Sequence, residues 1–452
     1  MGGKEMKREK SFFRSVCALA VPVALQSMLQ ASFSIVDQIM IGQLGSVNVA
    51  GVGLAGKFSS IFSVVVAAIG VVAGIMISQY IGQKNRREVR RSFYVNLVFS
   101  VGLALLFTLL CFFAPQAVMG IYSEDPKTIA AAADYLFLLA GSFLPMAGAT
   151  LLATLFRCME KASLPLYASI AAALLNTGLN YVLIFGKLGF APMGIRGAAI
   201  ATVISQFANC LCMLAMLPAC GGALCRENAG KTAHTRFQWK QYAVMLLPIL
   251  ICELMWSVGE NVYAAIYGHL GTDASAAMTL TTPVQSLVIG ALCGLSQAAS
   301  VIIGKKLGNG ENEDAYRSSI KLVKYGFVGS LILSALIVLT RGLYTEIYSV
   351  EDSVKIMVQQ ILAAYAIISP FKIQNMILGG GVLRSGGKTH YIMVIDLVGT
   401  WVFGVPLGLL TAFVFHLPIA AVYFILSLEE CIRFAITVVV FRRRSWMQQL
   451  KA

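Results

Sequence analysis

The sequence predicts an all-α integral membrane protein with twelve transmembrane helices in two six-helix repeats. Three observations lead to this prediction. Hydrophobic residues make up 58% of the chain and charged residues only 12%, with a mean hydropathy of +0.77, whereas soluble domains carry roughly 25% charged residues. Apolar stretches long enough to cross a bilayer as helices follow one another along the chain. The second half of the chain also repeats landmarks of the first.

The repeat is visible in prolines, glycines and basic residues at a constant spacing of 226 positions. The pairs are Pro22 and Pro248, Gly42 and Gly268, Leu44 and Leu270, Gly45 and Gly271, Gly82 and Gly308, and Arg91 and Arg317. By Arg157 and Lys161 the spacing is one residue longer, at Arg384 and Lys388. Two similar apolar halves are typical of transporters built from repeats around a central site.

Each half contains six apolar segments that can cross a hydrocarbon core of roughly 30 Å as helices. In the first half they are 16–41, 52–79, 93–115, 129–156, 164–186 and 194–218. In the second half they are 242–267, 276–303, 325–347, 357–383, 391–415 and 418–441. Because six is even, both repeats enter the membrane from the same side, so we expect an axis along the membrane normal to relate them.

The segments divide the chain into two lobes joined by the longest polar break in the sequence. The predicted parts are an N-terminus (1–15), an N-lobe (16–218), a linker (219–240), a C-lobe (241–441) and a C-terminus (442–452).

The net charge of +14 follows this topology. Most basic residues fall in the loops on the N-terminal side of the predicted membrane. The opposite side carries only Lys127, Lys187, Arg196, Arg341 and Lys355. The positive-inside rule then predicts a multi-pass protein of the cell (inner) membrane with both termini in the cytoplasm. The basic excess indicates attraction to anionic lipid rather than a nucleic-acid partner.

Several classes of function are disfavoured by what the sequence lacks. The ten cysteines are scattered and form no Cys-x-x-Cys pair, and the four histidines lie near predicted loops, so no metal or redox site is expected. No Walker phosphate-binding loop appears, and no stretch is long and polar enough for a soluble catalytic domain. We therefore expect neither an enzyme nor a cofactor.

Asp37 is an acidic residue inside the first apolar segment, where a charge costs roughly 2.5–3.5 kcal/mol on insertion scales. With Gln26, Gln30 and Phe33 it forms one stripe of a helix, since these residues are three or four positions apart. The carboxyl group is predicted to take up a proton or bind a cation. The alternative is a purely structural role, bonded to neighbouring amides.

Asn176 and Asn180 lie one helical turn apart in the fifth segment, and Thr202 lies in the sixth beside a run of small residues. Together with Asp37 they could form an oxygen cage for a hard monovalent cation. Hydrogen bonds between helices are an equally good interpretation from spacing alone.

Glu253 and Glu260 share one face of the seventh segment, with Trp256 between them, and Lys372 in the tenth is the predicted counter-charge. They are predicted either to form a structural ion pair or to handle substrate or ions. Gln26, Gln30 and Trp256 join these three as candidates for a substrate cavity. Glu429 and Glu430, four and three positions before Arg433, predict salt bridges along one helix.

At this point the sequence resembles the multidrug and toxic compound extrusion (MATE) family over nearly its whole length. The matching residues are Pro22, the stretches 36–45 and 78–82, Arg157, Lys161, the run 194–206, the run 384–389, and Glu430, Arg433, Phe441, Arg442 and Trp446. The run 194–206 and the stretch 36–45 are the most specific of these.

The resemblance implies two six-helix lobes in a V around a cavity that opens alternately to each side. It implies a monomeric antiporter that exports organic cations and drugs against inward flow of Na⁺ or H⁺. The family's N-lobe cation site falls on Asp37, Asn176, Asn180 and Thr202, and any Na⁺ would bind at Asp37. Asn180 departs from relatives that carry Asp there, which removes one negative charge. A second acidic site of some members falls near Trp256 and Ile373, which are not acidic here.

The alternative function is a lipid or oligosaccharide-lipid flippase of the same superfamily. Flippases for anionic cargo usually need a strongly basic central cavity. Here Lys57 and Lys372 are the only lysines deep in the predicted membrane, which favours cationic or neutral cargo.

Overall fold

The computed structural model describes residues 2–220, 238–348 and 350–451, and within these ranges it contains helices and no β-strand. Eleven of the described helical stretches are long and apolar enough to cross a membrane. The twelfth predicted span, 418–441, is divided at Leu428 into α15 (Ile419–Ser427) and α16 (Glu429–Arg442). The all-α, twelve-helix prediction is confirmed. The predicted linker 219–240 lies largely outside the described residues, and the lobe boundaries beside it stay predictions.

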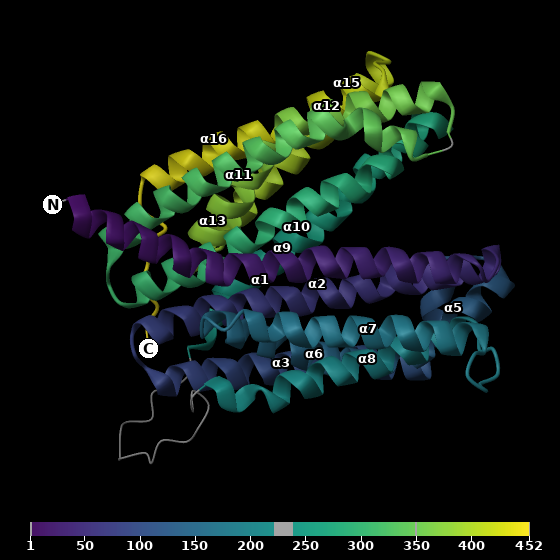
Figure 1. The fold of residues 1–452 in the computed structure, drawn as a ribbon, viewed down its shortest axis with the longest axis horizontal. Coiled ribbons are helices and arrows are strands. Elements are labelled where there is room, and N and C mark those ends of the chain that lie inside the picture. Colours follow the sequence, from purple (N-terminus) through teal and green to yellow (C-terminus); the bar gives the residue numbers. More distant parts are fainter. Residues whose placement is uncertain (1, 221–237, 349, 452) are drawn as a thin grey trace. The chain divides into compact units, whose positions relative to one another are not determined.

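The first repeat contains six spans in chain order (Figure 1). They are α1 (Gly2–Gly42), α2 (Ser46–Gly82), α3 (Arg86–Phe113), α5 to α6 (Pro126–Leu139, η1 Ala140–Ser142, Phe143–Cys158), α7 (Ser163–Phe185) and α8 (Ile195–Ala215). The short helix α4 (Pro115–Gly120) precedes α5, and η2 (Leu217–Cys220) follows α8.

The second repeat follows the same order. Its spans are α9 (Trp239–His269), α10 (Thr272–Gly308), α11 (Asn312–Glu346), α12 with the π-helical η3 (Asp352–Gln374, Asn375–Leu383), the stretch from α13 to η5, and α15 with α16. That stretch consists of α13 (His390–Leu397), η4 (Val398–Gly404), α14 (Val405–Leu409) and η5 (Leu410–Val414), of which η4 and η5 are π-helical.

The turn between the first two helices contains a glycine with positive φ in both repeats. Gly45, after α1, has φ +89°, and its equivalent Gly271, after α9, has φ +116°. Side chains other than hydrogen disfavour positive φ, so glycine is the residue that fits this turn. The repeated glycines of the sequence therefore mark a repeated backbone geometry.

Contacts divide the molecule into two units. The C-terminal unit contains the described parts of Met1–Ala24, Ser78–Lys84 and Thr235–Ala452, and the N-terminal unit contains those of Leu25–Ile77 and Asn85–His234. The start of α1 and the end of α2 thus pack with the second repeat, although they belong to the first in sequence. Within the C-terminal unit, α11 and α16 both lie against α12 (Figure 1).

The N-terminal unit is held together by aromatic packing and by close helix contacts. Phe62 of α2 stacks near Phe143 of α6, with ring centroids 4.5 Å apart, and near Phe107 of α3 at 5.4 Å. Gly197 lets α8 approach α7, because a Cβ there would lie 2.7 Å from the Leu183 carbonyl carbon. This close approach brings the polar residues of α7 and α8 together.

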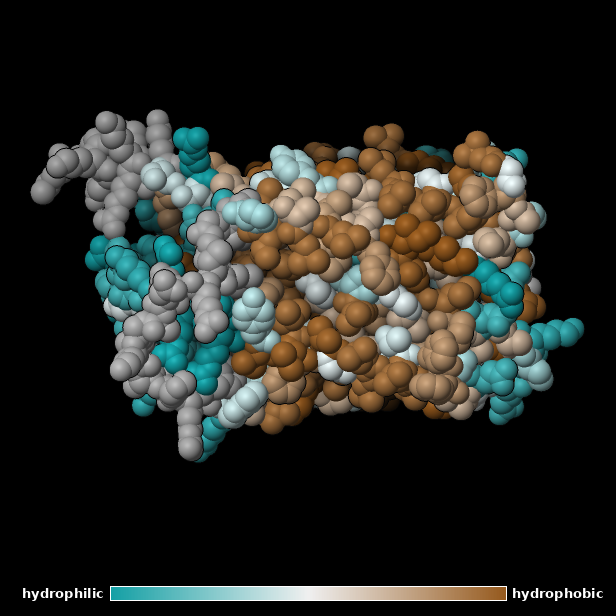
Figure 2. Space-filling view, turned by 90° about the horizontal axis from the view of Figure 1, so that it is seen from below, coloured by the Kyte–Doolittle hydropathy of each residue, from teal (hydrophilic) through white to brown (hydrophobic). Residues whose placement is uncertain are grey.

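The outer surface fits a lipid environment. On the face seen in Figure 2, hydrophobic side chains fill a broad central zone and hydrophilic side chains gather at both of its ends. Large apolar side chains such as Val98, Leu106 and Phe113 of α3 and Leu211 of α8 are exposed. Exposed apolar surface of this extent is stable in a bilayer and not in water.

The C-terminal tail after α16 is bound to the end of α2. The fully buried Gln79 donates from Nε2 to the backbone carbonyls of Ser385 at 2.7 Å and Gln448 at 3.1 Å, and its Oε1 accepts from the Leu450 backbone amide at 2.8 Å. Trp446 is fully buried as well. The tail therefore joins the helix end 78–84 to the rest of the C-terminal unit.

Candidate coupling and substrate sites

Asp37 lies on α1 and is half-buried against α7 within the N-terminal unit. Asn180 of α7 donates from Nδ2 to Asp37 Oδ1 at 2.8 Å. The helical register explains the meeting, since Asn176 and Asn180 are one turn apart and face α1 together. The structure therefore brings together the acid and the two asparagines that the sequence singled out.

Asn176 completes the hydrogen bonding of the carboxylate. In the amide orientation that satisfies its neighbours, its nitrogen donates to both Asp37 oxygens at 3.1 Å, and its oxygen accepts from Ser205 Oγ at 3.3 Å. Two asparagine amides thus direct N–H groups at one carboxylate inside a membrane-spanning helix pair. Such donors stabilise the ionised form of a carboxyl group.

The remaining polar groups around Asp37 come from α5 and α8. Thr202 Oγ1 donates to the backbone carbonyl of Ala198 at 3.0 Å and lies 3.5 Å from the Asn176 amide. Tyr135 of α5 is close enough to interact with both Thr202 and Asp37. Ser205 and Tyr135 were not among the predicted site residues. Ser205 was recognisable, because it follows Thr202 by one turn of the same helix, whereas no sequence spacing links Tyr135 to Asp37.

The site has the chemistry to hold a small cation or a proton. Asn180 Oδ1 is buried and has no hydrogen-bond partner in the part of the chain that the structure describes, so an amide oxygen beside the carboxylate is available. Carboxylate, amide and hydroxyl oxygens are suitable ligands for a hard cation. Among the described residues, no cluster of three or more His, Cys, Asp or Glu side chains could hold a metal ion.

Gln26 and Gln30, the other polar residues predicted on this stripe of α1, do not contact Asp37. Gln26 donates from Nε2 to Ser169 Oγ of α7 at 2.8 Å. Gln30 is exposed. The polar stripe of α1 therefore contacts α7 at two points, through Gln26 and through Asp37.

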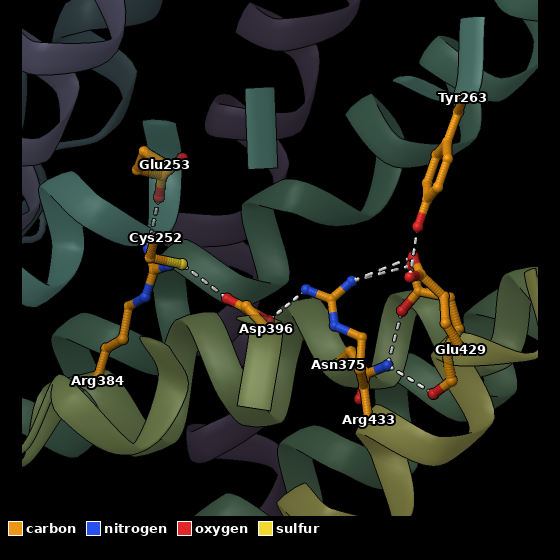
Figure 3. Close-up of polar contacts among 9 residues, drawn as sticks. Cys252, Glu253, Tyr263, Asn375, Arg384, Asp396, Glu429 and Arg433 are labelled. Atoms are coloured by element: carbon orange, nitrogen blue, oxygen red, sulfur yellow. Dashed lines mark hydrogen bonds and ion pairs between the residues drawn. The ribbon is translucent and has the colours of Figure 1, made fainter. Parts of the chain in front are cut away.

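A second polar cluster lies in the C-terminal unit (Figure 3). Glu253 of α9 forms an ion pair with Arg384, with Oε1 3.1 Å from the guanidinium Nη1. The predicted pair between Lys372 and Glu253 or Glu260 is therefore wrong. Lys372 forms no hydrogen bond or ion pair with any residue of the described ranges. Arg384 is the residue directly after η3, and its side chain reaches Glu253 of α9 and neutralises it.

Arg433 of α16 is the centre of the cluster. It pairs with Asp396 of α13, and its Nη1 lies 3.5 Å from Glu430 Oε1 and 3.9 Å from Glu429 Oε1. The salt bridges predicted along the last helix are confirmed. Asp396 also accepts a hydrogen bond from the Cys252 thiol at 2.8 Å, which continues the cluster to α9 (Figure 3).

The two glutamates at the start of α16 have further partners on other helices. Tyr263 of α9 donates from its hydroxyl to Glu429 Oε2 at 2.6 Å, and Asn375 of η3 donates from Nδ2 to Glu430 Oε2 at 2.8 Å. Both glutamates are only 6% exposed. Buried acids of this kind are stable only when paired and hydrogen-bonded, and the break at Leu428 lets both side chains face the cluster.

Two cavities of the C-terminal unit adjoin this cluster. One, of about 310 Å³, is lined by acidic residues and tyrosines, among them Glu260, Tyr263, Tyr267 and Glu429. The other, of about 420 Å³, is lined by Trp256, Met376, Gly380, Arg384 and Arg433, among others. Lys372 and Glu430 line both. The predicted cavity residues Glu253, Trp256, Glu260 and Lys372 therefore all line one or both cavities, whereas Gln26 and Gln30 lie on α1.

Two repeats of six membrane-spanning helices, each with a buried polar cluster and no soluble domain among the described residues, define a membrane transporter. The MatE family model matches residues 22–182 and again 248–410. The two matches begin 226 positions apart, which is the spacing of the repeat. The chain belongs to the MatE family.

Relatives and solved structures agree with this assignment. The chain is 26% identical to a probable multidrug resistance protein NorM of Rhodopseudomonas palustris, over 86% of this chain and 82% of the relative. It is 24% identical to multidrug and toxin extrusion protein 2 of Pongo abelii, over 92% and 72%. A crystal structure of MATE in the bent conformation superposes with a TM-score of 0.86 at 18% identity and covers 96% of each chain. That likeness shows the fold.

Proposed function

We propose that this protein is a secondary active antiporter that exports organic cations and drugs from the cytoplasm in exchange for H⁺ or Na⁺ by alternating access. The observation that carries the proposal is Asp37, a carboxylate held by two amides between α1 and α7. The names of the relatives, which refer to multidrug resistance and to multidrug and toxin extrusion, support the class of cargo.

Asp37 couples the entry of H⁺ or Na⁺ to the export of cargo because its carboxylate is either neutralised by the ion or negatively charged. When it binds H⁺ or Na⁺ its charge is neutralised, and the hydrogen bonds with Asn176 and Asn180 must rearrange, since their N–H groups favour the ionised form. When that ion leaves, the negative charge is restored and favours a cationic substrate. Helix packing around α1 and α7 differs between the two states, which links ion binding to conformation.

Protons can drive this exchange without help from the membrane potential. One unit of pH gradient supplies about 1.4 kcal/mol per proton. Exchange of one proton for one monovalent cation moves no net charge, so the additional 2.3 kcal/mol or so per 100 mV does not apply. The expected accumulation is about tenfold per pH unit. Asn180 adds no second carboxylate for Na⁺.

We place the protein in the cell membrane as a monomer, with both termini in the cytoplasm. The support is the positive-inside pattern of the loops. Within the C-terminal unit, the basic segments 305–321 and 442–451 and the start of α1 meet at one end: Lys321 pairs with Glu9 at 2.9 Å, and Arg444 with Glu313 at 2.9 Å.

The experiment is efflux of a fluorescent cation from proteoliposomes under a pH gradient and, separately, a Na⁺ gradient. Wild-type protein is expected to export the fluorescent cation when H⁺ or Na⁺ can flow in the opposite direction down its own gradient. Asp37→Asn is expected to keep its melting temperature and to lose gradient-driven efflux, because the amide can neither take up a proton nor carry the charge. Glu124→Gln, at an exposed acid outside the membrane-spanning helices, is the matched control. Wild-type efflux rates in Asp37→Asn would contradict the coupling role.

A further inference from the structure

We propose that the larger cavity of the C-terminal unit holds the aromatic body of the exported cargo, and that Gly380 of η3 sets the size of the body that it accepts. This inference rests on the proposed export function and narrows its substrate class to compact aromatic cations. It concerns the binding of cargo and not the coupling to an ion, so binding measurements without a gradient test it.

The first step is the charge balance of the larger cavity. Its lining contains as many acids as bases, namely Glu253, Asp396 and Glu430 against Lys372, Arg384 and Arg433. Arg384 and Arg433 form ion pairs with these acids. Because the charges of the lining balance, a bound molecule is selected by its shape and its apolar surface rather than by a net charge of the wall.

The second step is the apolar part of the wall. Large apolar side chains from α9, α10, α12, η3 and α13 line the cavity, namely Trp256, Ile289, Ile373, Met376, Ile392 and Ile395. Trp256 is 45% exposed, so its indole ring has free surface. Aromatic rings pack on one another by offset stacking or edge-to-face contact, and an indole ring also attracts a cation. An aromatic cation therefore matches this wall better than an aliphatic one.

The third step is the part of the wall that has no side chain. Gly379 and Gly380 belong to the π-helical segment η3 and line the cavity. Among the described residues outside the helix itself, the atom nearest to a Cβ at Gly380 would be Ser296 Oγ, at 3.6 Å. For a Cβ at Gly379 it would be Ile392 Cδ1, at 3.7 Å. Both are ordinary van der Waals distances, so helix packing does not require glycine at either position.

The next residue, Gly381, has a different role. A Cβ there would lie 2.7 Å from the backbone carbonyl oxygen of Ser296, so this glycine lets η3 approach α10. Gly379 and Gly380 instead leave free volume in the cavity lining. The cavity measures about 420 Å³, near the lower end of the range of roughly 300–1,000 Å³ for pockets that bind drug-sized ligands. A side chain at position 380 therefore removes volume that a bound body needs.

The test uses two monocations of different size, N-methylquinolinium with two fused rings and N-methylacridinium with three. Binding of each to purified full-length protein in nanodiscs is measured by fluorescence without an ion gradient, and binding to empty nanodiscs is subtracted. Wild type is expected to bind the three-ring cation about fivefold or more tightly, because the third ring buries more apolar surface.

Gly380→Val is expected to weaken binding of the three-ring cation by about tenfold or more and to leave the Kd of the two-ring cation within about twofold. The reason is that small changes of volume in a tight apolar pocket change affinity by about tenfold or more. Gly380→Ala, with its smaller side chain, is expected to have an intermediate effect. Trp256→Leu is expected to weaken both cations, because both lose the aromatic wall.

Two control variants separate the size of the cavity from other effects. Gly381→Ala is expected to lower the melting temperature and to keep the ratio of the two affinities, because its Cβ meets α10. Ala264→Val enlarges a side chain in the lining of the smaller cavity, and it is expected to leave both affinities within about twofold.

Equal affinity of wild type for the two cations overturns the inference, and this measurement needs no variant to fold. An unchanged ratio of affinities in folded Gly380→Val also overturns it, as does a ratio that changes in Ala264→Val instead. If Gly380→Val does not fold, Gly380→Ala gives the same comparison. Loss of gradient-driven efflux in wild type, with the size preference intact, would contradict antiport and leave the larger cavity as the cargo site.

Discussion

At the scale of single residues, the C-terminal unit is organised by arginines rather than by the lysine that the sequence suggested. Arg384 and Arg433 have side chains 13% and 11% exposed, and each meets an acid on another helix. Guanidinium groups hold several donors in one plane and remain charged when buried, which suits them to shared acids.

The pair of Glu253 and Arg384 gives a direct prediction. Glu253→Gln and Arg384→Met each lower the melting temperature, because each leaves the opposite charge without its partner. The double variant recovers part of the loss, and the coupling free energy is expected to be about 0.5–3 kcal/mol.

The same cycle between Glu253→Gln and Lys372→Met serves as the control and is expected to be additive, since these two residues form no ion pair. Coupling in that cycle, with additivity between Glu253 and Arg384, would mean that the pairing described above is not the one in the membrane.

At the scale of helices, α2 and α10 cross at a contact that obeys the internal repeat. A Cβ at Gly82 would collide with the backbone carbonyl of Lys305, and a Cβ at Gly308 with that of Gln79. Gln79 and Lys305 are themselves repeat equivalents, 226 positions apart. The contact is therefore reciprocal, as expected where two copies of one element meet across a pseudo-twofold axis.

This symmetry predicts equal effects of two substitutions. Gly82→Ala and Gly308→Ala should each destabilise the protein by about 1–3 kcal/mol, because the backbone opposite cannot move aside as a flexible side chain would. Thermal unfolding in detergent measures the loss.

Gly102→Ala in α3 is the control, since a Cβ there lies more than 4 Å from every atom of the described residues that it could contact. It should be neutral or slightly stabilising, by about 0.5–1 kcal/mol at most. Unchanged stability for both Gly82→Ala and Gly308→Ala would indicate that α2 and α10 are apart for most of the time.

At the scale of the whole molecule, the C-terminal tail joins parts of the chain that lie far apart in sequence. Gln449 donates to the Gly308 carbonyl at 2.6 Å, and Gln83 to the Leu450 carbonyl at 2.8 Å. The tail thus contacts the ends of both α2 and α10 beside their glycine crossing. These contacts hold the ends of α2 and α10 together within the C-terminal unit.

Trp446 is the anchor of the tail and gives the last prediction. It is fully buried and stacks on Phe441, with ring centroids 5.8 Å apart. Trp446→Ala is expected to cost about 3–5 kcal/mol of stability, as for other buried aromatic residues. Trp239→Ala, at a side chain 56% exposed, should change it by about 0.5 kcal/mol or less. The melting temperatures of both variants test whether Trp446 anchors the tail. Equal small losses of stability would show that the tail is not bound.

The sequence by itself determined the class of fold, the number of spans and the core of the N-terminal site. Hydropathy, the 226-residue spacing and the helical positions of Asp37, Asn176 and Asn180 are local or periodic signals, and helices preserve such signals as faces. The Glu429, Glu430 and Arg433 bridges were predictable for the same reason, because they lie within one turn of each other.

Only the tertiary structure decided which charges meet across helices. Glu253 could have paired with Lys372 by hydropathy and charge alone, and only the three-dimensional placement of Arg384, directly after η3, brings Arg384 to Glu253 instead. The place of Tyr135 beside Asp37 and the contacts of Gln79 with the tail likewise depend on how helices distant in sequence are packed. Pairing between helices carries no period in the sequence, since it follows from the position and rotation of each helix in the bundle. That is why the meeting of Asp37 with Asn176 and Asn180 was recognisable from the sequence, whereas the pairing of Glu253 with Arg384 was not.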